Sequence, residues 1–554
     1  MKAVAIIQAR TGSTRLPGKV LKPILGEPML ARMLERVKRA KEIDHIIVAT
    51  SEKSRDDAVA ELATRTGVGV FRGSEDDVLD RVYRAAKEID ADVVVCLTGD
   101  CVLHDPSVID EATRHFIDAH DPLAYAGTPA NYPEGLDTDI FAFSALEEAA
   151  QNGRLPSERE HLAQYFKNRP ERFHGLPWTV GERDDSAMHW SVDTEQDFEF
   201  ATKIFEELYP ANPVFGKDDI LALLARKPGL LEINKGGTGY EGLAKTKKKD
   251  EVWKGLMKRL TLGTVQLGKT YGLDDVGQPT KEESFAILDA AYAAGITTFD
   301  TAGDYGNAVD ILGEWVSTCN VAGEISVLSK LGPRTLGEHA GEVDAATIIR
   351  ADVEQTLRRL KLNRLSCYLL NNSRYVFRED ALHALRAIKQ DGLAERIGVS
   401  VYDEDEALEA VRQGLDCVEV PYNAFDQRLD ATDFWPKAKE QGTTVFARSP
   451  FLQGVLLMSP EQLPANIAGA RPYLEEFIRI AREFNLSQME AALLFSLHAT
   501  SVARVVFGVK TLAQLEGNLA SARASVPDGF IEAIRARLQG IGREIVNPML
   551  WKQS

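Results

Sequence analysis

The sequence predicts an α/β protein in two parts, a mainly parallel β-sheet covered by helices and then an eight-stranded β/α barrel. The chain has 554 residues, more than one hydrophobic core usually supports, so two or more domains are expected. In residues 1–232, short apolar runs alternate with helical patterns, which is typical of βαβ units. In residues 257–554, eight short apolar runs recur with helical patterns between them, over the usual length of a β/α barrel.

In the first part, strands are expected at Val4–Gln8, Ile46–Thr50 and Val93–Leu97, and helices at Met29–Ala40 and Asp77–Glu88. This alternation favours a parallel sheet with helices on both faces. Ligands of such sheets bind at the carboxyl ends of the strands, so the loops that follow the strands are the first places to search for a site.

The eight strands expected in the second part are short, and each has a polar residue at or just after its end. They are Leu260–Gln266, Ile296–Asp300, Ile325–Lys330, Cys367–Asn371, Ile397–Ser400, Cys417–Val420, Thr444–Ala447 and Val505–Val509. The polar residues fall on the C-terminal rim of the predicted barrel, where barrel enzymes carry their catalytic groups.

A linker is predicted at residues 233–256, between the domains 1–232 and 257–554. Asn234–Gly239 is rich in glycine, which disfavours helix and strand interiors. Lys245–Asp250 is a charge run, which indicates a solvated linker, with a patch for an anionic ligand as the alternative.

The composition is that of a globular protein, with 44% hydrophobic and 27% charged residues. A formal net charge of −18 argues against binding of nucleic acid or of membrane surfaces, because their phosphates would repel the chain. The sequence has neither a signal-peptide pattern nor an apolar run long enough for membrane insertion, so a cytoplasmic location is expected. The five cysteines are odd in number and scattered, which predicts reduced thiols and neither a disulfide framework nor a zinc site.

A basic, glycine-containing loop, Gly12–Lys19, follows the first expected strand. Glycines let backbone N–H groups approach a phosphate, and Arg10, Arg15 and Lys19 could neutralise it. The loop is not an ATPase P-loop, because Val20 stands where that motif requires Ser or Thr. Taken alone, it could equally be an ordinary surface loop.

Two aspartates strengthen the phosphate hypothesis. Asp100 directly follows a predicted strand, and Asp193 follows a short apolar stretch. Two carboxylates together with triphosphate oxygens suit octahedral Mg²⁺, although either aspartate by itself is more often a helix N-cap.

Four motifs give the first part a resemblance to the cytidylyltransferase family that activates KDO and acylneuraminate sugars, closest to its spore-coat-polysaccharide branch. They are Gly12–Lys19, Ser74–Arg81, Thr98–Asp100 and Val192–Thr194, in the family's order. The resemblance implies a Rossmann-like nucleotidyltransferase that uses CTP.

The same resemblance implies roles for individual residues. The implied CTP phosphate contacts are Arg10, Gly12, Ser13, Arg15 and Lys19, with Arg15 and Lys19 also serving catalysis. Asp100 and Asp193 would hold Mg²⁺. Substrate contacts are implied for Asp137, Glu160 and His161, and His161 could instead be a packed or capping histidine.

In the second part, Asp300, Tyr305 and Lys330 fall at or just after the ends of two successive predicted strands. Tyrosine is a poor acid at neutral pH unless a cation lowers its pKa, and a buried lysine needs a carboxylate partner. The three side chains together predict a proton donor for a carbonyl group that accepts a hydride.

Residues 258–545 resemble the aldo-keto reductases. The motifs that carry the resemblance are Phe299–Gly306, Lys330, Ile397–Ser400, Pro421–Asn423, Arg448–Gly454 and Gly508–Asn518. The resemblance implies a (β/α)₈ TIM barrel that binds NADPH, with NADH as the alternative. The implied cofactor-binding residues are Ser400, Glu419, Ser449, Phe451, Leu452, Gly454, Lys510, Gln514 and Asn518, of which Lys510 could meet a 2′-phosphate.

Four residues depart from the family pattern. Asn371 stands in place of the catalytic histidine, where an amide can donate a hydrogen bond but cannot relay a proton. Val401 replaces an amide-binding Asn, Glu419 replaces Gln, and Arg448 replaces a stacking aromatic residue. A cofactor-binding domain without catalysis is the alternative.

The two halves together predict a bifunctional enzyme of surface-polysaccharide synthesis. In the leading hypothesis, CTP activates a KDO-like or nonulosonic acid as its CMP derivative, and the reductase adjusts a keto group in the same pathway. The runner-up is a reductase that makes an alditol phosphate from a sugar phosphate, followed by conversion to a CDP-alditol. A third hypothesis makes the first half a non-catalytic nucleotide sensor. The sequence leaves open whether the chain forms a homo-oligomer.

Overall fold

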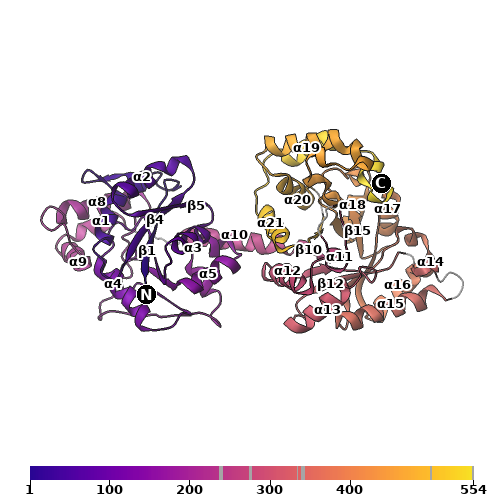
Figure 1. Cartoon of the computed structure of the whole chain (residues 1–554), viewed down its shortest axis with the longest axis horizontal. Coiled ribbons are helices and arrows are strands. Elements are labelled where there is room, and N and C mark those ends of the chain that lie inside the picture. Colours follow the sequence, from indigo (N-terminus) through magenta and orange to yellow (C-terminus); the bar gives the residue numbers. More distant parts are fainter. Residues whose placement is uncertain (236–240, 274–276, 334, 339–342, 500–501, 552–554) are drawn as a thin grey trace. The chain divides into compact units, whose positions relative to one another are not determined.

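The computed structural model describes residues 1–235, 241–273, 277–333, 335–338, 343–499 and 502–551 (Figure 1). The chain divides into two compact units, Met1–Val252 and Trp253–Ser554. The division falls within the segment that was predicted to be a linker. Of the glycine-rich stretch, residues 236–240 lie outside the described residues.

The first unit is built on a seven-stranded sheet in the order β5-β4-β1-β6-β8-β7-β9. The strands are β1 (Ala3–Gln8), β4 (His45–Ser51), β5 (Gly69–Gly73), β6 (Val93–Thr98), β7 (Ala124–Gly127), β8 (Asp139–Ala142) and β9 (His174–Gly175). β5, β4, β1 and β6 run parallel, whereas β8 is antiparallel to both β6 and β7. The mainly parallel sheet predicted from the sequence is therefore confirmed. A separate hairpin pairs β2 (Pro23–Ile24) with β3 (Glu27–Pro28).

Helices cover both faces of this sheet (Figure 1). Along β1, Ala5 and Ile7 enter one core while Val4 and Ile6 enter the other, which is the alternation that a strand buried on both faces requires. The first core is closed by α1 (Met29–Val37), α2 (Asp57–Arg65), α4 (Pro106–Asp118), α8 (Glu195–Leu208) and α9 (Lys217–Arg226). The second is closed by α3 (Val78–Glu88), α5 (Phe143–Asn152) and α7 (Ala163–Lys167), with α6 (Pro156–Glu160) beside them.

The second unit is a closed barrel of eight parallel strands. They are β10 (Leu260–Gly263), β11 (Thr298–Asp300), β12 (Ser326–Leu331), β13 (Leu365–Leu370), β14 (Ala394–Ser400), β15 (Cys417–Pro421), β16 (Thr444–Arg448) and β17 (Arg504–Gly508). Each overlaps one of the eight apolar runs read from the sequence, and β10 pairs with β17 to close the ring. The predicted barrel is confirmed.

Helices surround this barrel in the order of the chain (Figure 1). They are α11 (Val265–Gly268), α12 (Lys281–Ala293), α13 (Ala308–Cys319), α14 (Thr335–Glu338), α15 (Ala345–Leu360), α16 (Glu379–Gln390), α17 (Glu404–Arg412), α18 (Phe434–Glu440), α19 (Arg471–Glu483), α20 (Gln488–His498), α21 (Leu512–Ala522), α22 (Phe530–Leu538) and α23 (Arg543–Val546).

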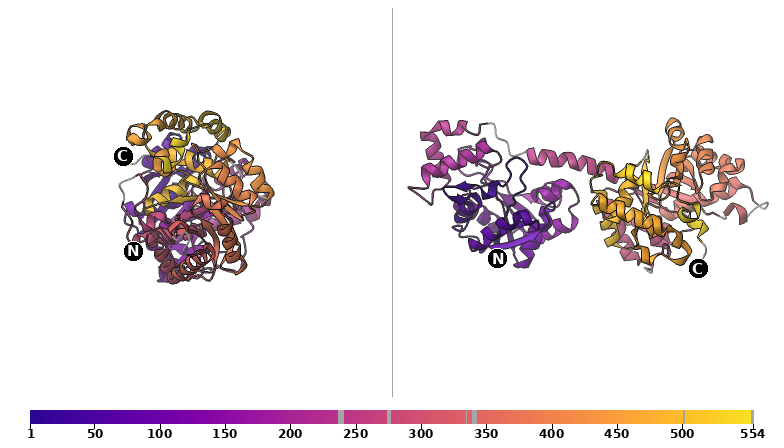
Figure 2. Two further views of the ribbon diagram at one scale, coloured as in Figure 1. Left: turned by 90° about the vertical axis from the view of Figure 1, so that its right-hand side faces the viewer. Right: turned by 90° about the horizontal axis from the view of Figure 1, so that it is seen from above.

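The charge run predicted to be a solvated linker forms part of a helix, with Lys245, Lys247, Lys248 and Lys249 exposed. It lies in α10 (Glu241–Met257), which Figure 2 shows as one continuous helix. Asp250 is buried and its carboxylate accepts a hydrogen bond from the backbone N–H of Ser157, 2.9 Å away. Lysine, glutamate and alanine are good helix formers, so a run of charge can be a helix wherever one face finds a packing partner.

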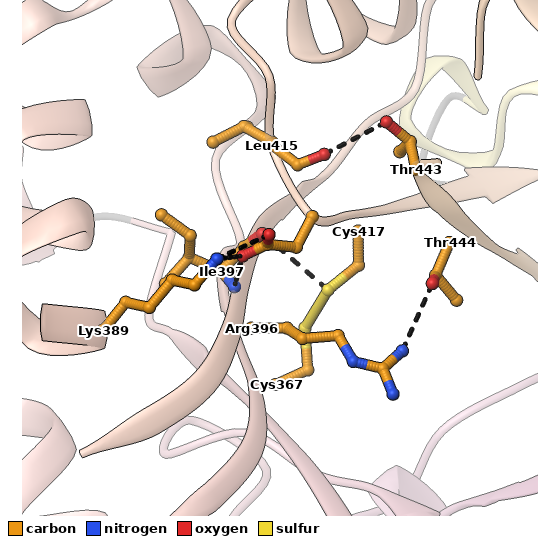
Figure 3. Close-up of a disulfide and its surroundings, with 9 residues drawn as sticks. Cys367, Lys389, Arg396, Ile397, Leu415, Cys417, Thr443 and Thr444 are labelled. Atoms are coloured by element: carbon orange, nitrogen blue, oxygen red, sulfur yellow. Dashed lines mark hydrogen bonds and ion pairs between the residues drawn. A yellow bond between two sulfur atoms is a disulfide. The ribbon is translucent and has the colours of Figure 1, made fainter. Parts of the chain in front are cut away.

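The prediction of five reduced cysteines is wrong for one pair. Cys367 of β13 and Cys417 of β15 form a disulfide in the barrel interior, while Cys96, Cys101 and Cys319 are free (Figure 3). The two strands flank β14, and both cysteines belong to the apolar cluster inside the barrel. The pairing arises because barrel closure brings inward-facing positions 50 residues apart together, which spacing along the sequence does not report.

Within the described part of the chain, no helix is both long and apolar enough to cross a bilayer.

Candidate functional sites

In the first unit, the side chain of Lys19 lies between two carboxylates. Its Nζ is 2.9 Å from Oδ2 of Asp100 and 3.0 Å from Oδ1 of Asp193, and it donates to the carbonyl oxygen of Val192 at 2.7 Å. The structure therefore brings together three residues that the sequence predicted to act at one site. Only 9% of the lysine side chain is exposed, so these contacts are made largely out of water.

The sheet explains why these residues meet. β1 and β6 are adjacent and parallel, so the loop after β1 and Asp100 after β6 emerge at the same edge. Gly99 permits this, because a Cβ there would lie 2.9 Å from the carbonyl oxygen of Gln8. The segment that carries Asp193 is tied to the same edge by a 2.9 Å hydrogen bond from the N–H of Val192 to the carbonyl oxygen of Asp100.

The electrostatics of the cluster favour the charged forms. Burial alone would raise the pKa of Asp100, but the Lys19 ammonium outweighs it and holds that pKa below its usual value. Burial likewise would lower the pKa of Lys19, and the two aspartates raise it instead. A lysine and an aspartate whose charged forms are favoured, Lys19 and Asp100, suit a site that handles a polyphosphate and a divalent cation.

The other basic residues of the loop lie close by. The guanidinium of Arg15 is 2.8 Å from Oδ1 of Asp193, and that of Arg10 donates to the carbonyl oxygen of Glu75 at 3.2 Å. Ser13 Oγ accepts from the N–H of Leu16 within the loop. A Cβ at Gly12 would lie 3.0 Å from the carboxylate of Glu75, so this position has little room for a side chain.

A buried aspartate that the sequence analysis missed anchors this loop. Asp56, after β4, accepts hydrogen bonds from the backbone N–H of Thr11 at 2.7 Å and from its hydroxyl at 2.6 Å. The hydroxyl of Ser51 also donates to this carboxylate. Nothing in the local sequence distinguishes such an aspartate from a helix cap.

The donor set of this cluster fits Mg²⁺. One ammonium nitrogen touches an oxygen of both Asp100 and Asp193, so the two carboxylates are within reach of a single cation. Carboxylate oxygens are the ligands that Mg²⁺ prefers, and it needs few of them from the protein when phosphates supply the rest.

Of the predicted substrate residues, Asp137 lies near this cluster. Its carboxylate accepts from the N–H of Gly135 at 2.7 Å. Burial raises the pKa of Asp137 to about 6, and the charge of Asp100 adds to the rise.

Glu160 and His161 are not brought to Lys19. The hydroxyl of Thr246 on α10 donates to the carboxylate of Glu160 at 3.0 Å and lies 3.3 Å from Nε2 of His161. Burial lowers the pKa of His161.

A histidine that the sequence analysis missed supports Asp193. His189 is 2.9 Å from the carboxylate of Glu134 and 3.5 Å from that of Asp197. The Asp197 carboxylate in turn accepts from the backbone N–H groups of Asp193, at 3.1 Å, and Thr194, at 2.8 Å. His189 therefore joins the segment that precedes Asp137 to the one that presents Asp193. The Thr194-x-x-Asp197 capping box was the one readable signal.

Replacing His189 by Gln is expected to weaken CTP–Mg²⁺ binding by roughly tenfold, since a lost charged hydrogen bond is worth about 1.5 kcal/mol. Burial would lower the pKa of His189, but Asp197 and Glu134 raise it to about 10. The imidazolium thus stabilises the fold fully below pH 6.5, and this contribution is lost as the pH rises through about 10. Calorimetric CTP titration and urea unfolding at pH 7 and 10.5 check both effects. A variant that matches the wild type in both would contradict the assignment.

In the second unit, Lys330 contacts two partners that the sequence predicted, Asp300 and Tyr305, and one residue that departs from the family pattern, Glu419. Its Nζ is 2.7 Å from Oδ2 of Asp300, 3.2 Å from the hydroxyl of Tyr305 and 3.1 Å from Oε2 of Glu419. Asp300 ends β11, Lys330 lies in β12 and Glu419 in β15, so the barrel brings them to its rim.

The pKa of Tyr305 is not lowered overall, contrary to what the sequence led us to expect. Lys330 does act to lower the pKa of Tyr305, but burial outweighs it and the pKa is raised overall. Burial raises the pKa of Asp300 to about 7, although Lys330 opposes the rise. Burial alone would lower the pKa of Lys330, and the surrounding carboxylates raise it well above its usual value. These shifts favour the protonated phenol of Tyr305 and the ammonium form of Lys330.

These side chains line a cavity of about 230 Å³ at the rim of the barrel. Most of the predicted site residues line it, namely Asp300, Tyr305, Lys330, Asn371, Ser400, Glu419, Ser449, Phe451, Gly454, Gln514 and Asn518. Leu452 and Lys510 are buried and are not among the lining residues, and the backbone N–H of Lys510 donates to the amide of Gln514. Gln266, Tyr271 and Tyr402 also line the cavity and were not predicted, and Gln453, which lies within the Arg448–Gly454 motif, lines it as well.

The residues around this cavity fit a nicotinamide dinucleotide. They combine hydroxyl and amide groups from Ser400, Gln514 and Asn518 with a turn around Ser449 and Gly454, whose φ angles are 61° and 101°. A pocket that mixes apolar walls with a few polar groups is typical of cofactor sites.

Two family models match the chain. The model described as cytidylyltransferase matches residues 4–210, and that of the aldo/keto reductase family matches residues 259–538. The chain is 38% identical over 239 residues to an uncharacterized protein of Methanocaldococcus jannaschii, which covers 42% of this chain and 95% of that protein. It is 33% identical over 238 residues to the spore coat polysaccharide biosynthesis protein SpsF of Bacillus subtilis. This alignment covers 40% of the present chain and 94% of SpsF.

A 3-deoxy-manno-octulosonate cytidylyltransferase of Geobacter metallireducens is 40% identical over 112 residues, which are 20% of this chain and 43% of that protein. The boundary between the two compact units, at Val252 and Trp253, lies between the regions that the two family models match, and each of these three relatives aligns over less than half of the chain. The chain is therefore a nucleotidyltransferase of the cytidylyltransferase family joined to an oxidoreductase of the aldo/keto reductase family.

Proposed function

We propose that the first unit transfers a cytidylyl group from CTP to a KDO-like or nonulosonic acid sugar, and that the second reduces a carbonyl group with NADPH in the same surface-polysaccharide pathway. The observation that carries the transferase half is Lys19 held between Asp100 and Asp193, with Arg15 on the same carboxylate. Removing these charges from water costs folding free energy, and binding of an anionic ligand and a cation would explain why the protein tolerates that cost.

In the proposed transfer, an oxygen of the sugar attacks the α-phosphorus of CTP, and pyrophosphate leaves. Lys19 and Arg15 neutralise the charge that develops on the phosphates, and Asp100 and Asp193 would hold Mg²⁺. Bound there, the metal would neutralise phosphate charge. The remaining contribution is positioning, since this chemistry needs little acid–base catalysis.

In the proposed reduction, NADPH supplies the hydride when bound. Tyr305 donates its phenolic proton to the carbonyl oxygen, and the Lys330 ammonium, 3.2 Å away, stabilises the phenolate that results. Asp300 fixes Lys330 in place. Asn371 lines the same cavity, where its amide could donate a hydrogen bond to the carbonyl oxygen.

The choice of an acid sugar is supported by the similarity to a 3-deoxy-manno-octulosonate cytidylyltransferase and to a spore coat polysaccharide biosynthesis protein. The second candidate, synthesis of a CDP-alditol, is favoured by the reductase unit in the same chain, which could supply the alditol phosphate. Mass spectrometry of the product separates the two, because a CMP-sugar carries one phosphate and a CDP-alditol two. The non-catalytic sensor is disfavoured, because Lys19, Asp100 and Asp193 are assembled as a reacting site would need them.

A further inference from the structure

Among the described residues, one of the charged side chains that line the reductase cavity has N–H groups without a partner in the protein. Four charged side chains of the described residues line this cavity. They are Asp300, Lys330, Glu419 and Arg448. The ammonium of Lys330 has three N–H groups, and Asp300, Glu419 and Tyr305 occupy that many positions around it. Lys330 therefore has no N–H left for a further anion.

The guanidinium of Arg448, at the end of β16, is fixed by three contacts that do not use all of its N–H groups. Its Nε lies 3.4 Å from Oε1 of Glu419, and its Nη2 donates to the carbonyl oxygen of Val401 at 2.9 Å. Its guanidinium carbon stacks over the ring of Tyr402, 4.3 Å from the centroid. A guanidinium has five N–H groups, so these contacts leave donors on a side chain that faces a cavity.

Glu419 is not the partner that Arg448 would need for full compensation. Its carboxylate already pairs with Lys330 at 3.1 Å and accepts from the hydroxyl of Ser400 at 2.9 Å, both closer than the guanidinium. The contact with Glu419 thus helps to fix the orientation of the Arg448 guanidinium plane. A fixed guanidinium plane is what two-point binding of a carboxylate or phosphate requires.

The wall next to Arg448 is polar. Tyr271 and Gln453 line the cavity, and the amide of Gln453 donates to the hydroxyl of Tyr271 at 3.3 Å. These groups can exchange hydrogen bonds with substrate hydroxyls, which an apolar wall could not do.

We propose that Arg448 binds an anionic group, a carboxylate or a phosphate, on the carbonyl compound that the second unit reduces. The substrate of the reductase is then an acidic, hydroxylated carbonyl compound. The proposal rests on the proposed reductase activity. It assigns to the second unit a substrate of the same charge class as the one proposed for the first.

The test compares Arg448→Gln with wild-type full-length protein on matched pairs of carbonyl compounds, with NADPH as the reductant. One pair is phenylglyoxylate and its methyl ester, and the other is glyceraldehyde 3-phosphate and glyceraldehyde. The quantity measured is the ratio of kcat/KM for the anion to kcat/KM for its neutral counterpart. We expect this ratio to fall by about 100-fold in at least one pair, the usual effect of removing one partner of a buried charge pair.

Two further variants guard against a merely structural effect. Arg396 lies outside the lining of this cavity, so Arg396→Gln should leave both ratios unchanged. Arg448→Lys keeps the charge but loses the planar fork, and it should recover part of the ratio. NADPH affinity is followed by fluorescence titration in each variant, so that a loss of cofactor binding is separated from a loss of anion recognition.

The outcomes separate the alternatives. A fall confined to the keto-acid pair assigns a carboxylate, and a fall confined to the other pair assigns a phosphate. Equal losses on anionic and neutral substrates, or a weakened NADPH affinity that accounts for the loss, would overturn the proposal. If the wild type reduces none of the four compounds while binding NADPH, the proposed reductase function fails instead.

Discussion

Replacing Asp100 by Ala is expected to abolish CTP-dependent pyrophosphate release, with a loss of about 1000-fold or more, the scale seen when a group that neutralises charge in the transition state is removed. The variant loses a proposed Mg²⁺ ligand and frees Lys19 from the partner 2.9 Å away. Release of pyrophosphate at saturating Mg²⁺ and CTP measures the effect.

Asp118, at the exposed end of α4, provides a matched control. Asp118→Ala removes the same atoms on the surface and should leave release unchanged. If Asp100→Ala turned over CTP at the wild-type rate, the metal assignment and the role of the Lys19 cluster would both be wrong.

Replacing Tyr305 by Phe is expected to lower carbonyl reduction by roughly 1000-fold, in the range typical for loss of a general acid. The phenol is the proton donor proposed for the carbonyl oxygen, and Lys330 can stabilise a phenolate only if the hydroxyl is present. NADPH binding should persist, because the ring of Tyr305 remains.

Single-turnover oxidation of bound NADPH, together with a fluorescence titration, distinguishes loss of chemistry from loss of binding. Tyr292→Phe, on α12, removes a hydroxyl that pairs with Glu324 outside the cavity and should have no effect on reduction. Wild-type reduction by the Tyr305 variant would show that another group supplies the proton.

Much of the fold was predictable because periodicity and spacing are local properties. The alternation of Val4, Ala5, Ile6 and Ile7 between two cores is visible in the sequence as a continuous apolar run. The eight barrel strands were found in the same way. The residues at strand ends, such as Asp100 and Lys330, followed from the rule that parallel strands present their carboxyl ends at one edge.

What could not be predicted depends on contacts between distant segments. The disulfide between Cys367 and Cys417 follows from barrel closure, and helix α10 from packing that buries Asp250. The link from His189 to Asp197 required knowledge of how two loops meet. Each involves partners that no short motif contains.

The departures from the family pattern were visible singly, but their relation was not. In the sequence, Glu419 and Arg448 are two separate substitutions. In the structure they are neighbours, with Nε of Arg448 3.4 Å from Oε1 of Glu419. Because β15 and β16 are paired, Arg448 lies beside Glu419 and adds to the compensation that the Lys330 ammonium, 3.1 Å from the same carboxylate, already gives. A buried carboxylate is tolerated only where such compensation exists.

The measurement that tests the central claim most directly is pyrophosphate release from CTP and Mg²⁺ in the presence of a panel of 2-keto-3-deoxy acid sugars and a panel of polyol phosphates. The account predicts release with an acid sugar and a product that contains CMP. Release only with polyol phosphates, giving a product with two phosphates, would contradict it and establish the CDP-alditol reaction in its place.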